Sequence, residues 1–488
     1  MNLVRKNEYI CDLIHELRKL PHETEWVEFK RSYANHHEIG EYISALSNSA
    51  ALIGKEHAYL IWGVDDETHE VVGTRFSTSA AKEGNEGLEN WLARLLTPRI
   101  HFRFYSVKID GHPLALLEIG AAFHHPVRFM DQEFIRVGSH TKKLKEYPEK
   151  ERELWRVFDQ RPFESRIAAE HLYADDVLKL LDYQAYFDLS DRVLPDGKDA
   201  ILDALAKDNL LLPCEAGGWN ITNLGAILFA KKLDAFSGLK RKTMRVIHYK
   251  DRSKSEALRE QVSERGYAVG FDGLISIIMT MVPANEIIGR ALRRTAPMFP
   301  QLAVRELVAN ALIHQDFSVA GAGPMVEIFE DRMEITNPGI PLVDTLRFVD
   351  TPPKSRNETL ASVMRRLNIC EERGSGIDKV VAEVELYQLP APYFEAPNGF
   401  TRTVLFAHKA LNEMDKEDRV RACYLHACLK WVMRDYLTNA SLRARFGVEQ
   451  KNKAAISRYI REALDEKAVK AFDAGASRKL MRYVPFWA

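Results

Sequence analysis

The chain has 488 residues, which is more than one hydrophobic core usually holds and favours about three domains. Its composition of 46% hydrophobic and 28% charged residues excludes a largely disordered chain. The formal net charge of -1 excludes a global attraction for nucleic acid or acidic lipid, so binding of either kind requires a local basic patch.

The cysteines and the apolar segments indicate the cellular compartment in which the protein is found. The five cysteines are scattered, and none forms a C-x2-C pair of the kind that binds zinc. The first residues carry charges where a signal peptide needs an apolar core, and no run approaches the roughly eighteen apolar residues of a membrane helix. We therefore expect a reduced, cytoplasmic protein without a membrane partner.

Residues 1–150 mix helical and strand patterns and are expected to form the first domain. Apolar spacing and turn residues predict a helix over 8–20, a helix over Ile39–Ser49, a buried strand over Ala58–Val64, a hairpin of Phe102–Ile109 and Pro113–Ile119 turning at Asp110 and Gly111, and a strand over Glu133–Val137. The Lys- and Glu-rich stretch 143–155 is typical of a solvated connector.

Acidic residues gather at two places in this domain. Within H-E-T-E-W-V-E-F-K-R-S, Glu28 and Lys30 are two residues apart and share one face of an extended segment. Asp65 and Asp66 follow the strand pattern Y-L-I-W-G-V. Carboxylates from two segments are suitable ligands for Mg²⁺ or Mn²⁺, which activate water for phosphodiester cleavage. Taken alone, a strand rich in Glu and Lys is equally well explained as a solvated surface.

Four blocks in order, E-x4-E-F-K, I-S-A-L-S-N-S, Y-L-I-W-G-V-D-D and F-I-R-V-G-S-H-T, resemble the Schlafen AlbA domain over about residues 20–145. Nuclease members of that family bind metal through three acidic residues and cut tRNA or related RNA. The resemblance implies Glu23, Glu28 and Asp66 as catalytic metal ligands, with Lys30 beside them and Asp65 as the alternative to Asp66. The family's Asn-Thr-x-Gly-Gly turn is N-S-A-A-L-I-G-K-E-H-A here, so a non-cleaving nucleic-acid binder is the alternative.

Basic residues of the same domain are candidates for a groove that faces phosphates, although each alone is an ordinary surface charge. They are Arg31, Arg128, Arg136, Lys142 and Lys143.

Residues 160–296 are expected to form a helical connector. Helical segments, a hairpin-like stretch and a further helix between 165 and 232 resemble a small winged-helix element. Thr243–Tyr249 is a strand candidate, and a long helical run is predicted to end near Arg294.

The segment 301–314, Q-L-A-V-R-E-L-V-A-N-A-L-I-H, is predicted to be a helix. Glu306, Asn310 and His314 are four residues apart and therefore form one polar stripe on it. Such a stripe can also simply face solvent. Downstream come M-V-E-I-F-E-D-R-M-E-I-T-N-P-G-I-P, which predicts two strands, and then S-R-N-E-T-L-A and E-E-R-G-S-G-I-D-K-V.

The order of these blocks resembles a divergent GHKL-type ATPase domain over residues 297–408. The resemblance implies that Glu306 activates water and Asn310 holds Mg²⁺, while Asn337 and Gly339 stand where an aspartate and a glycine meet adenine. Glycines at the start of a helix allow close approach of phosphate to the backbone. The implied ATP-binding residues are Asn310, His314, Asn337, Gly339, Arg356, Gly374, Ser375 and Gly376.

Residues 412–488 are expected to form a C-terminal winged helix. From Ser441 to the end the chain has eleven Lys or Arg against five Asp or Glu, and Lys451, Lys453, Arg458 and Arg461 lie on or beside the second predicted helix. A helix-turn-helix-wing order suits binding to nucleic-acid phosphates, although winged helices also serve as protein-interaction modules.

The sequence thus predicts an α+β multidomain protein with a Schlafen-type AlbA domain, a GHKL-like α/β sandwich and winged-helix elements. We expect an enzyme, an ATP-responsive nuclease dependent on Mg²⁺ or Mn²⁺ that acts on RNA or single-stranded nucleic acid. The family resemblance also suggests antiviral defence against phage and a homo-oligomer. The alternatives are a nucleotide-sensing, DNA-binding transcriptional regulator without nuclease activity, and an assembly scaffold.

Overall fold

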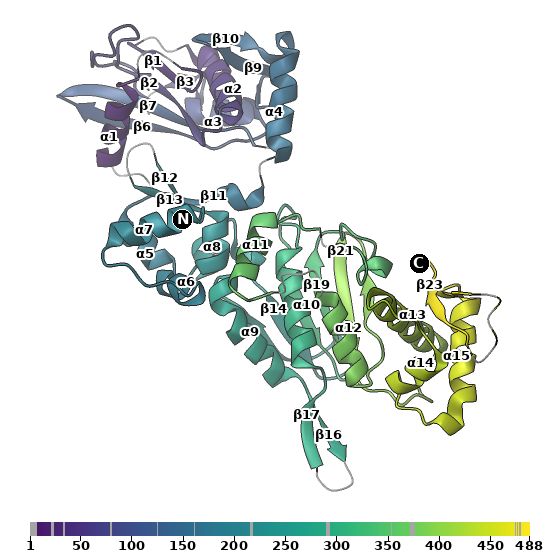
Figure 1. Ribbon diagram of the computed structural model, residues 1–488. Helices are drawn as coiled ribbons and strands as arrows, with labels where there is room; N and C mark the ends of the chain where they lie inside the picture. The colour runs from purple at the N-terminus through teal and green to yellow at the C-terminus, as the bar shows by residue number, and fades with distance from the viewer. Residues whose placement is uncertain are drawn as a thin grey trace. The chain divides into compact units, whose positions relative to one another are not determined.

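The computed structural model describes residues 7–20, 24–32, 35–78, 81–123, 125–160, 162–214, 218–288, 293–352, 354–370, 376–473, 475, 477 and 480–488. The chain divides into two compact units, one built from residues 2–162 and 213–219 and the other from 163–212 and 220–488 (Figure 1). Among the described residues, no helix combines the length and apolar character needed to cross a bilayer. The fold is mixed α and β with several sheets, as the sequence predicts.

The N-terminal unit contains a four-stranded sheet in the order β1–β2–β7–β6. Its strands are β1 (Val27–Lys30), β2 (His57–Trp62), β6 (Phe102–Ile109) and β7 (His112–Gly120). β1 and β2 are parallel, and the other neighbours are antiparallel. Asp110 and Gly111 form the predicted turn with φ of 51° and 81°, the left-handed conformation that a two-residue hairpin turn requires.

A second sheet of the same unit has the order β10–β9–β8–β5. Its strands are β5 (Leu96–Thr97), β8 (Arg128–Phe129), β9 (Gln132–Val137) and β10 (His140–Lys143). The unit also contains α1 (Asn7–Leu17), α2 (His36–Leu52), the two-residue strands β3 (Lys82–Glu83) and β4 (Glu86–Gly87), α3 (Leu88–Leu95) and α4 (Pro148–Gln160). The prediction of a solvated connector over 143–155 was wrong, because Leu144 and Leu154 are fully buried in the core and α4 forms there.

Buried polar side chains of α2 attach this helix to the backbone of the second sheet. Asn48 donates to the carbonyl oxygens of Val127 (3.0 Å) and Phe134 (2.9 Å), and its own oxygen accepts from the Val127 amide at 2.7 Å. Ser44 adds contacts to the same two residues. The I-S-A-L-S-N-S block is therefore a fold determinant, since these groups satisfy backbone atoms that water cannot reach.

The second unit begins with a small sheet and a group of short helices. They are β11 (Ile167–Leu172), α5 (Ala174–Leu180), α6 (Tyr183–Leu189), α7 (Lys198–Lys207), β12 (Leu211–Pro213), β13 (Trp219–Thr222) and α8 (Asn223–Phe229). The sheet order is β11–β13–β12. Helices followed by a hairpin and another helix match the predicted order, and the winged-helix assignment stays a prediction.

A six-stranded sheet forms the middle of this unit, in the order β15–β14–β18–β19–β21–β20. Its strands are β14 (Arg245–Tyr249), β15 (Ala257–Val262), β18 (Met325–Ile328), β19 (Arg332–Pro338), β20 (Tyr393–Glu395) and β21 (Phe400–Phe406). β14 pairs in parallel with β18, so the sheet takes in strands that precede residue 297, the expected start of the ATP-binding domain.

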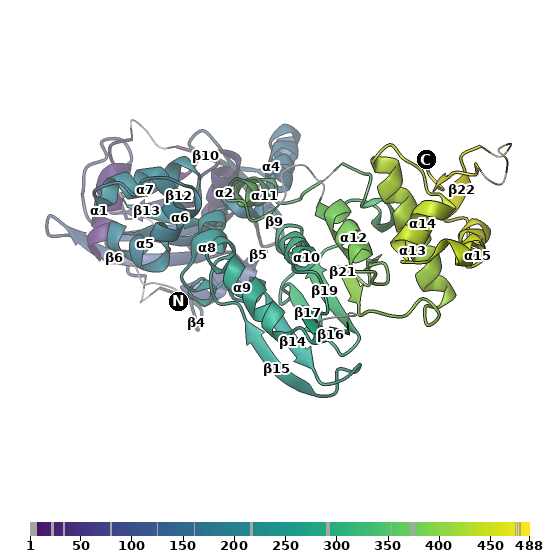
Figure 2. The same ribbon diagram turned by 60° about the horizontal axis from the view of Figure 1, so that its bottom comes forward.

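Three helices lie side by side on one face of this sheet (Figure 2): α9 (Tyr267–Met281), α10 (Gln301–Ile313) and α12 (Gly376–Leu386). A further helix, α11, spans Glu358–Arg366. The prediction of a helix reaching Arg294 was wrong. Pro283 follows the last turn of α9, where its missing amide and fixed φ end the helix. The chain then forms the hairpin of β16 (Ala284–Ile288) and β17 (Arg293–Pro297).

The C-terminal part follows the predicted order of helices and strands. α13 (Lys416–Val432) precedes α14 (Asn439–Arg445), α15 (Lys453–Asp465), β22 (Val469–Ala471) and β23 (Tyr483–Pro485). The last two strands pair in antiparallel fashion, as a wing would. Whether this part acts as a winged helix stays a prediction.

Replacing Asn48 tests the role of α2. Asn48→Ala leaves buried backbone groups of Val127 and Phe134 without partners, so we expect a loss of about 2–4 kcal/mol in the free energy of unfolding. Urea denaturation of the full chain measures it, with the exposed Asn85→Ala as the control. Equal midpoints for both variants would show that the helix does not depend on these bonds.

Candidate functional sites

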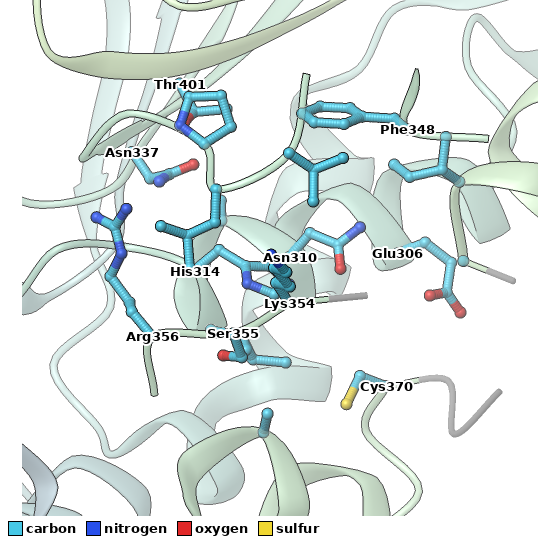
Figure 3. Close-up of a pocket in the computed structure, with 18 of the residues that line it drawn as sticks. Glu306, Asn310, His314, Asn337, Phe348, Lys354, Ser355, Arg356, Cys370 and Thr401 are labelled. Carbon is cyan, nitrogen blue, oxygen red and sulfur yellow. The ribbon is translucent and has the colours of Figure 1, made fainter. Parts of the chain in front are cut away.

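A cavity of about 900 Å³ lies in the second unit between α10, the strands β19 and β21, the segment after β19, and the helices α11 and α12 (Figure 3). Its volume is within the range of small-molecule sites, about 300–1,000 Å³. Residues predicted from the sequence line it: Glu306, Asn310, His314, Asn337, Arg356 and Gly376.

Helix α10 supplies the polar stripe of this cavity. Most of its side chains are buried, and Glu306 itself is only 7% exposed. The exposed side of α10 carries Gln301 and Leu302, whereas Glu306 and Asn310 line the cavity. The stripe is thus explained by the site and not by bulk solvent.

Helix α12 begins directly against the stripe. A Cβ added at Gly376 would lie 3.0 Å from Oε2 of Glu306 and 4.0 Å from Nδ2 of Asn310. The first residue of α12 therefore approaches both side chains because it has none of its own. Gly374 and Ser375, also predicted for the phosphates, lie outside the described residues.

The carboxyl group of Glu306 is kept from bulk water. Burial raises its pKa, and the charges of Lys379 and Arg305 counteract part of this effect. Cys370 lines the same end of the cavity, where burial and the charge of Glu306 raise its thiol pKa to about 11. A carboxyl with a raised pKa is a better proton acceptor, which suits a group that activates water.

The opposite end of the cavity contains His314, Asn337 and Arg356 (Figure 3). Burial and the charge of Arg356 lower the pKa of His314 to about 4, so its ring is neutral near pH 7. Asn337 is 5% exposed and donates from Nδ2 to the carbonyl oxygen of Pro338 at 3.1 Å. Arg356 donates to the carbonyl of Ile340 at 2.6 Å.

Gly339 lies next to this end of the cavity without lining it. Its φ is +104°, and an added Cβ would meet Nη1 of Arg356 at 2.1 Å and Cβ of Asp316 at 2.8 Å. The glycine therefore makes room for Arg356, and its predicted contact with adenine stays a prediction.

Several lining residues were missed from the sequence, among them Phe348, Lys354, Cys370, Thr401 and Thr403. Thr401 and Thr403 belong to β21, about sixty residues after the strand they pair with, and their place follows only from the register Asn337↔Thr401 and Ile335↔Thr403. Lys354 stands two residues before Arg356, so its proximity to the S-R-N-E-T-L-A block is a signal that the sequence offers.

In the N-terminal unit, Glu28 is buried and held by two cations. Lys30 Nζ lies 2.5 Å from Oε1 of Glu28, as their shared face on β1 predicts, and Arg136 Nη2 pairs with Oε2. Glu28 is 2% and Arg136 1% exposed. The expectation that Arg136 faces phosphate in a groove was wrong, because the guanidinium neutralises a buried carboxylate instead.

The two aspartates after β2 have different surroundings. Asp65 is buried, and its Oδ1 accepts from the amides of Glu67 (3.1 Å) and Thr68 (2.8 Å). These bonds, with that of Thr68 first, lower its pKa to about 2, and Arg31 pairs with its other oxygen. Asp66 is exposed. Glu23, the third predicted metal ligand, lies outside the described residues, so this trio stays a prediction.

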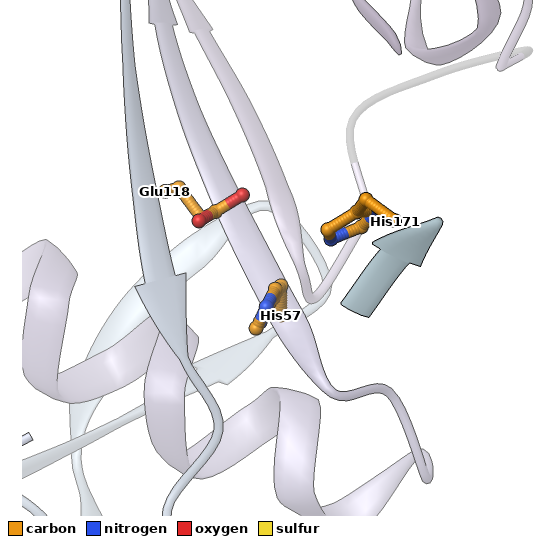
Figure 4. Close-up of side chains that lie close together, drawn as sticks. All are labelled: His57, Glu118 and His171. Atoms are coloured by element: carbon orange, nitrogen blue, oxygen red, sulfur yellow. The ribbon is translucent and has the colours of Figure 1, made fainter. Parts of the chain in front are cut away.

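Figure 4 shows other side chains that are able to bind metals. His57 on β2 and Glu118 on β7 belong to the N-terminal unit, where Glu118 is directly opposite Tyr59. His171, on β11, belongs to the other unit. Two ligands within one unit are too few for a structural metal site, which typically has four, so we assign no ion to them.

Two segments of the chain match known protein families. Residues 23–145 match the family model described as "Schlafen, AlbA_2", and residues 321–405 match "Putative ATP-dependent DNA helicase recG C-terminal". The chain thus combines a Schlafen-type segment with an ATPase-type segment, and the resemblance noted in the sequence is confirmed. Helix α10 precedes the second matched segment, whereas Asn337, Arg356 and Gly376 lie within it.

The solved structures that are similar to the chain include the following two. The DIP2311 protein from Corynebacterium diphtheriae covers 98% of this chain and 97% of its own, with 17% identity and a TM-score of 0.42. The N-terminal domain of a RecG-related protein from Nitrosomonas europaea, described as "Putative ATP-dependent DNA Helicase", covers 24% of this chain and 78% of its own, with 21% identity and a TM-score of 0.18. No curated protein matches the chain.

The buried pair of Glu28 and Arg136 can be tested by stability. Glu28→Gln removes the charge and leaves the guanidinium of Arg136 uncompensated, so we expect a loss of about 3 kcal/mol in the free energy of unfolding. Urea denaturation measures the loss, and the exposed Glu70→Gln is the control. A Glu28→Gln protein as stable as the control would mean that the pair is not a structural element.

Proposed function

We propose that the chain binds ATP in the cavity of its second unit and acts on nucleic acid through its N-terminal unit. One observation carries the nucleotide part. Glu306 and Asn310, one helical turn apart on a buried helix, face a cavity of about 900 Å³ beside the side-chain-free start of α12. A buried carboxylate is costly unless a polar or charged group compensates it, and a ligand in the cavity would supply such a group.

The residues at the two ends of the cavity suit different parts of a nucleotide, the phosphates with Mg²⁺ at one end and the adenine at the other. The amide oxygen of Asn310 is a hard ligand that suits Mg²⁺, which when bound with phosphate oxygens would neutralise their charge. Glu306 lies beside Gly376 at this end, where it can accept a proton from water. Lys354 lines the cavity as well and supplies positive charge for phosphates.

Asn337 suits the adenine end despite replacing the family's aspartate. Its Nδ2 is used by the carbonyl of Pro338, which leaves Oδ1 as an acceptor for the adenine amino group. Thr401 faces it across the strand pair and bonds to the carbonyl of Gly339 at 2.7 Å. These contacts support binding of ATP more than its rapid hydrolysis. A protein that binds ATP and hydrolyses it slowly would be suited to act as a nucleotide-dependent switch.

For the N-terminal unit we propose cleavage of RNA, tRNA-like substrates first, or of single-stranded nucleic acid. Glu28, Asp66 and Glu23 would hold a divalent ion, which would supply an activated water, and Lys30 would orient substrate. The donor set fits in part. Glu28 offers a carboxylate, but both of its oxygens are already paired with cations, so a metal ligand there requires the loss of one pair.

That pairing also favours a second candidate, a nucleotide-sensing DNA-binding regulator without nuclease activity. Its support comes from α15, where Lys453, Arg458 and Arg461 are exposed on the helix that follows the α14 turn. Exposed basic side chains on the second helix of such a pair suit contacts with phosphates, which set position and not sequence.

The nucleotide site is tested with Asn310→Ala. Loss of the amide removes a metal ligand, so we expect at least a tenfold weaker affinity for ATP in the presence of Mg²⁺, corresponding to about 1.4 kcal/mol. Isothermal titration calorimetry measures the affinity. Gln301→Ala, an exposed change on the same helix, is the matched control. Equal affinity in both variants would exclude the assignment of Asn310.

The nuclease is tested by incubating the full chain with tRNA and single-stranded DNA in Mn²⁺, with and without ATP. We expect cleavage by the wild type and a loss of about 100-fold in Asp66→Asn, which removes an exposed ligand without breaking a buried pair. The neighbouring Glu67→Gln is the control. If the wild type cleaves nothing but protects a specific DNA sequence in footprinting, the regulator is correct.

A further inference from the structure

The nucleotide cavity has one wall that carries few buried side chains of its own. Residues 341–351 run from the end of β19 toward α11, and Pro341, Val343, Phe348 and Thr351 from this segment line the cavity. Leu342 and Leu346 are each 50% exposed. A segment with so little burial does not fix its own position, so its contacts with neighbouring elements decide where the wall lies.

The C-terminal part of the chain supplies such contacts. The hydroxyl of Tyr424 on α13 donates to the carbonyl oxygen of Leu346. The indole Nε1 of Trp487 donates to the same hydroxyl at 3.0 Å. The Tyr424 oxygen therefore accepts from one partner and donates to another, which fixes its hydrogen in the direction of Leu346.

Arg347 attaches the same wall to the penultimate residue of the chain. Its guanidinium carbon lies 4.1 Å from the centre of the Trp487 ring, a cation–π contact. Its Nε also donates to both oxygens of Asp350 at 2.8 and 3.0 Å. The guanidinium is thus held from two sides, and Phe348, the next residue, lines the cavity.

A second connection runs through α12, whose first residue meets Glu306. Near the other end of this helix, Glu385 lies 2.9 and 3.0 Å from Nδ1 of His426 on α13. Arg445 of α14 lies 3.8 Å from the same carboxylate. His426 and Arg445 are 3% and 5% exposed. The C-terminal helices therefore contact two elements that border the cavity.

We propose that the C-terminal residues position the wall of the nucleotide cavity, with Tyr424 and Trp487 as the positioning residues for residues 344–348. This inference rests on the proposed binding of ATP and deepens it. Neither side chain touches the cavity, so both act through Leu346 and Arg347. Because coupling between sites is reciprocal, a ligand held by the C-terminal part would change the affinity for nucleotide through the same contacts.

The test compares ATP affinity in the wild type, Tyr424→Phe and Trp487→Phe, measured by titration calorimetry of the full chain with Mg²⁺. Tyr424→Phe removes the hydroxyl and both of its hydrogen bonds, and we expect an affinity about five- to tenfold weaker, the effect of losing the bond to Leu346. Tyr436→Phe is the matched control, since that ring packs against Trp431 and Phe472 in the same part of the chain.

Tryptophan fluorescence separates positioning from a general loss of structure. ATP should change the emission of the wild type and of Tyr436→Phe, and this change should be absent in Trp487→Phe. The thermal unfolding midpoint of Trp487→Phe should be close to that of Tyr436→Phe. Unchanged affinity in Tyr424→Phe and Trp487→Phe, with a wild type that binds, would overturn the inference alone. A wild type that does not bind ATP would overturn the proposed function and the inference with it.

Discussion

The packing of α10 against both the six-stranded sheet and the neighbouring α12 is the constraint on which the second unit depends. The exposed side of this helix carries Gln301 and Leu302, whereas its polar stripe of Glu306 and Asn310 lines the cavity. The contact at Gly376 sets how closely α12 approaches, because a side chain there would meet Glu306. The remaining lining residues come from strands and segments that follow from this arrangement. The proposed nucleotide site is therefore a consequence of helix packing, with few special features of its own.

The two units deal with a buried carboxylate in opposite ways. Glu28 is neutralised by Lys30 and Arg136, so the charge is compensated within the protein. Glu306 has no comparably close cation among the described residues, and burial raises its pKa. A compensated carboxylate stabilises a fold, whereas an uncompensated one is reactive toward protons and cations. Glu306 is therefore free to act on a ligand in the cavity, whereas cleavage by the N-terminal unit would depend on residues beyond Glu28.

The predictions that the structure confirms depend mostly on patterns among residues close together in the sequence. The hairpin at Asp110 and Gly111, the helix of the polar stripe and the order of the C-terminal helices all rest on signals within a few residues. Predictions failed where distant residues decide the outcome. Helix α4 forms because Leu154 packs into a core built from other segments. Arg136 is buried beside Glu28, which lies 108 residues away in the sequence, so no local pattern indicates the pair. The cavity residue Thr401 and the contact between Trp487 and Arg347 depend on strand register and packing across the unit, which spacing along the chain does not encode.

Binding of ATP in the cavity can be tested by hydrogen exchange measured by mass spectrometry, with and without a non-hydrolysable ATP analogue and Mg²⁺. We expect slower exchange in residues 301–314 of α10 and in the wall at 341–351, because a bound nucleotide orders both sides of the cavity. We also expect protection at the start of α12. Exchange that is unchanged in these segments at saturating nucleotide, or slowed only in the N-terminal unit, would contradict binding of ATP in the cavity.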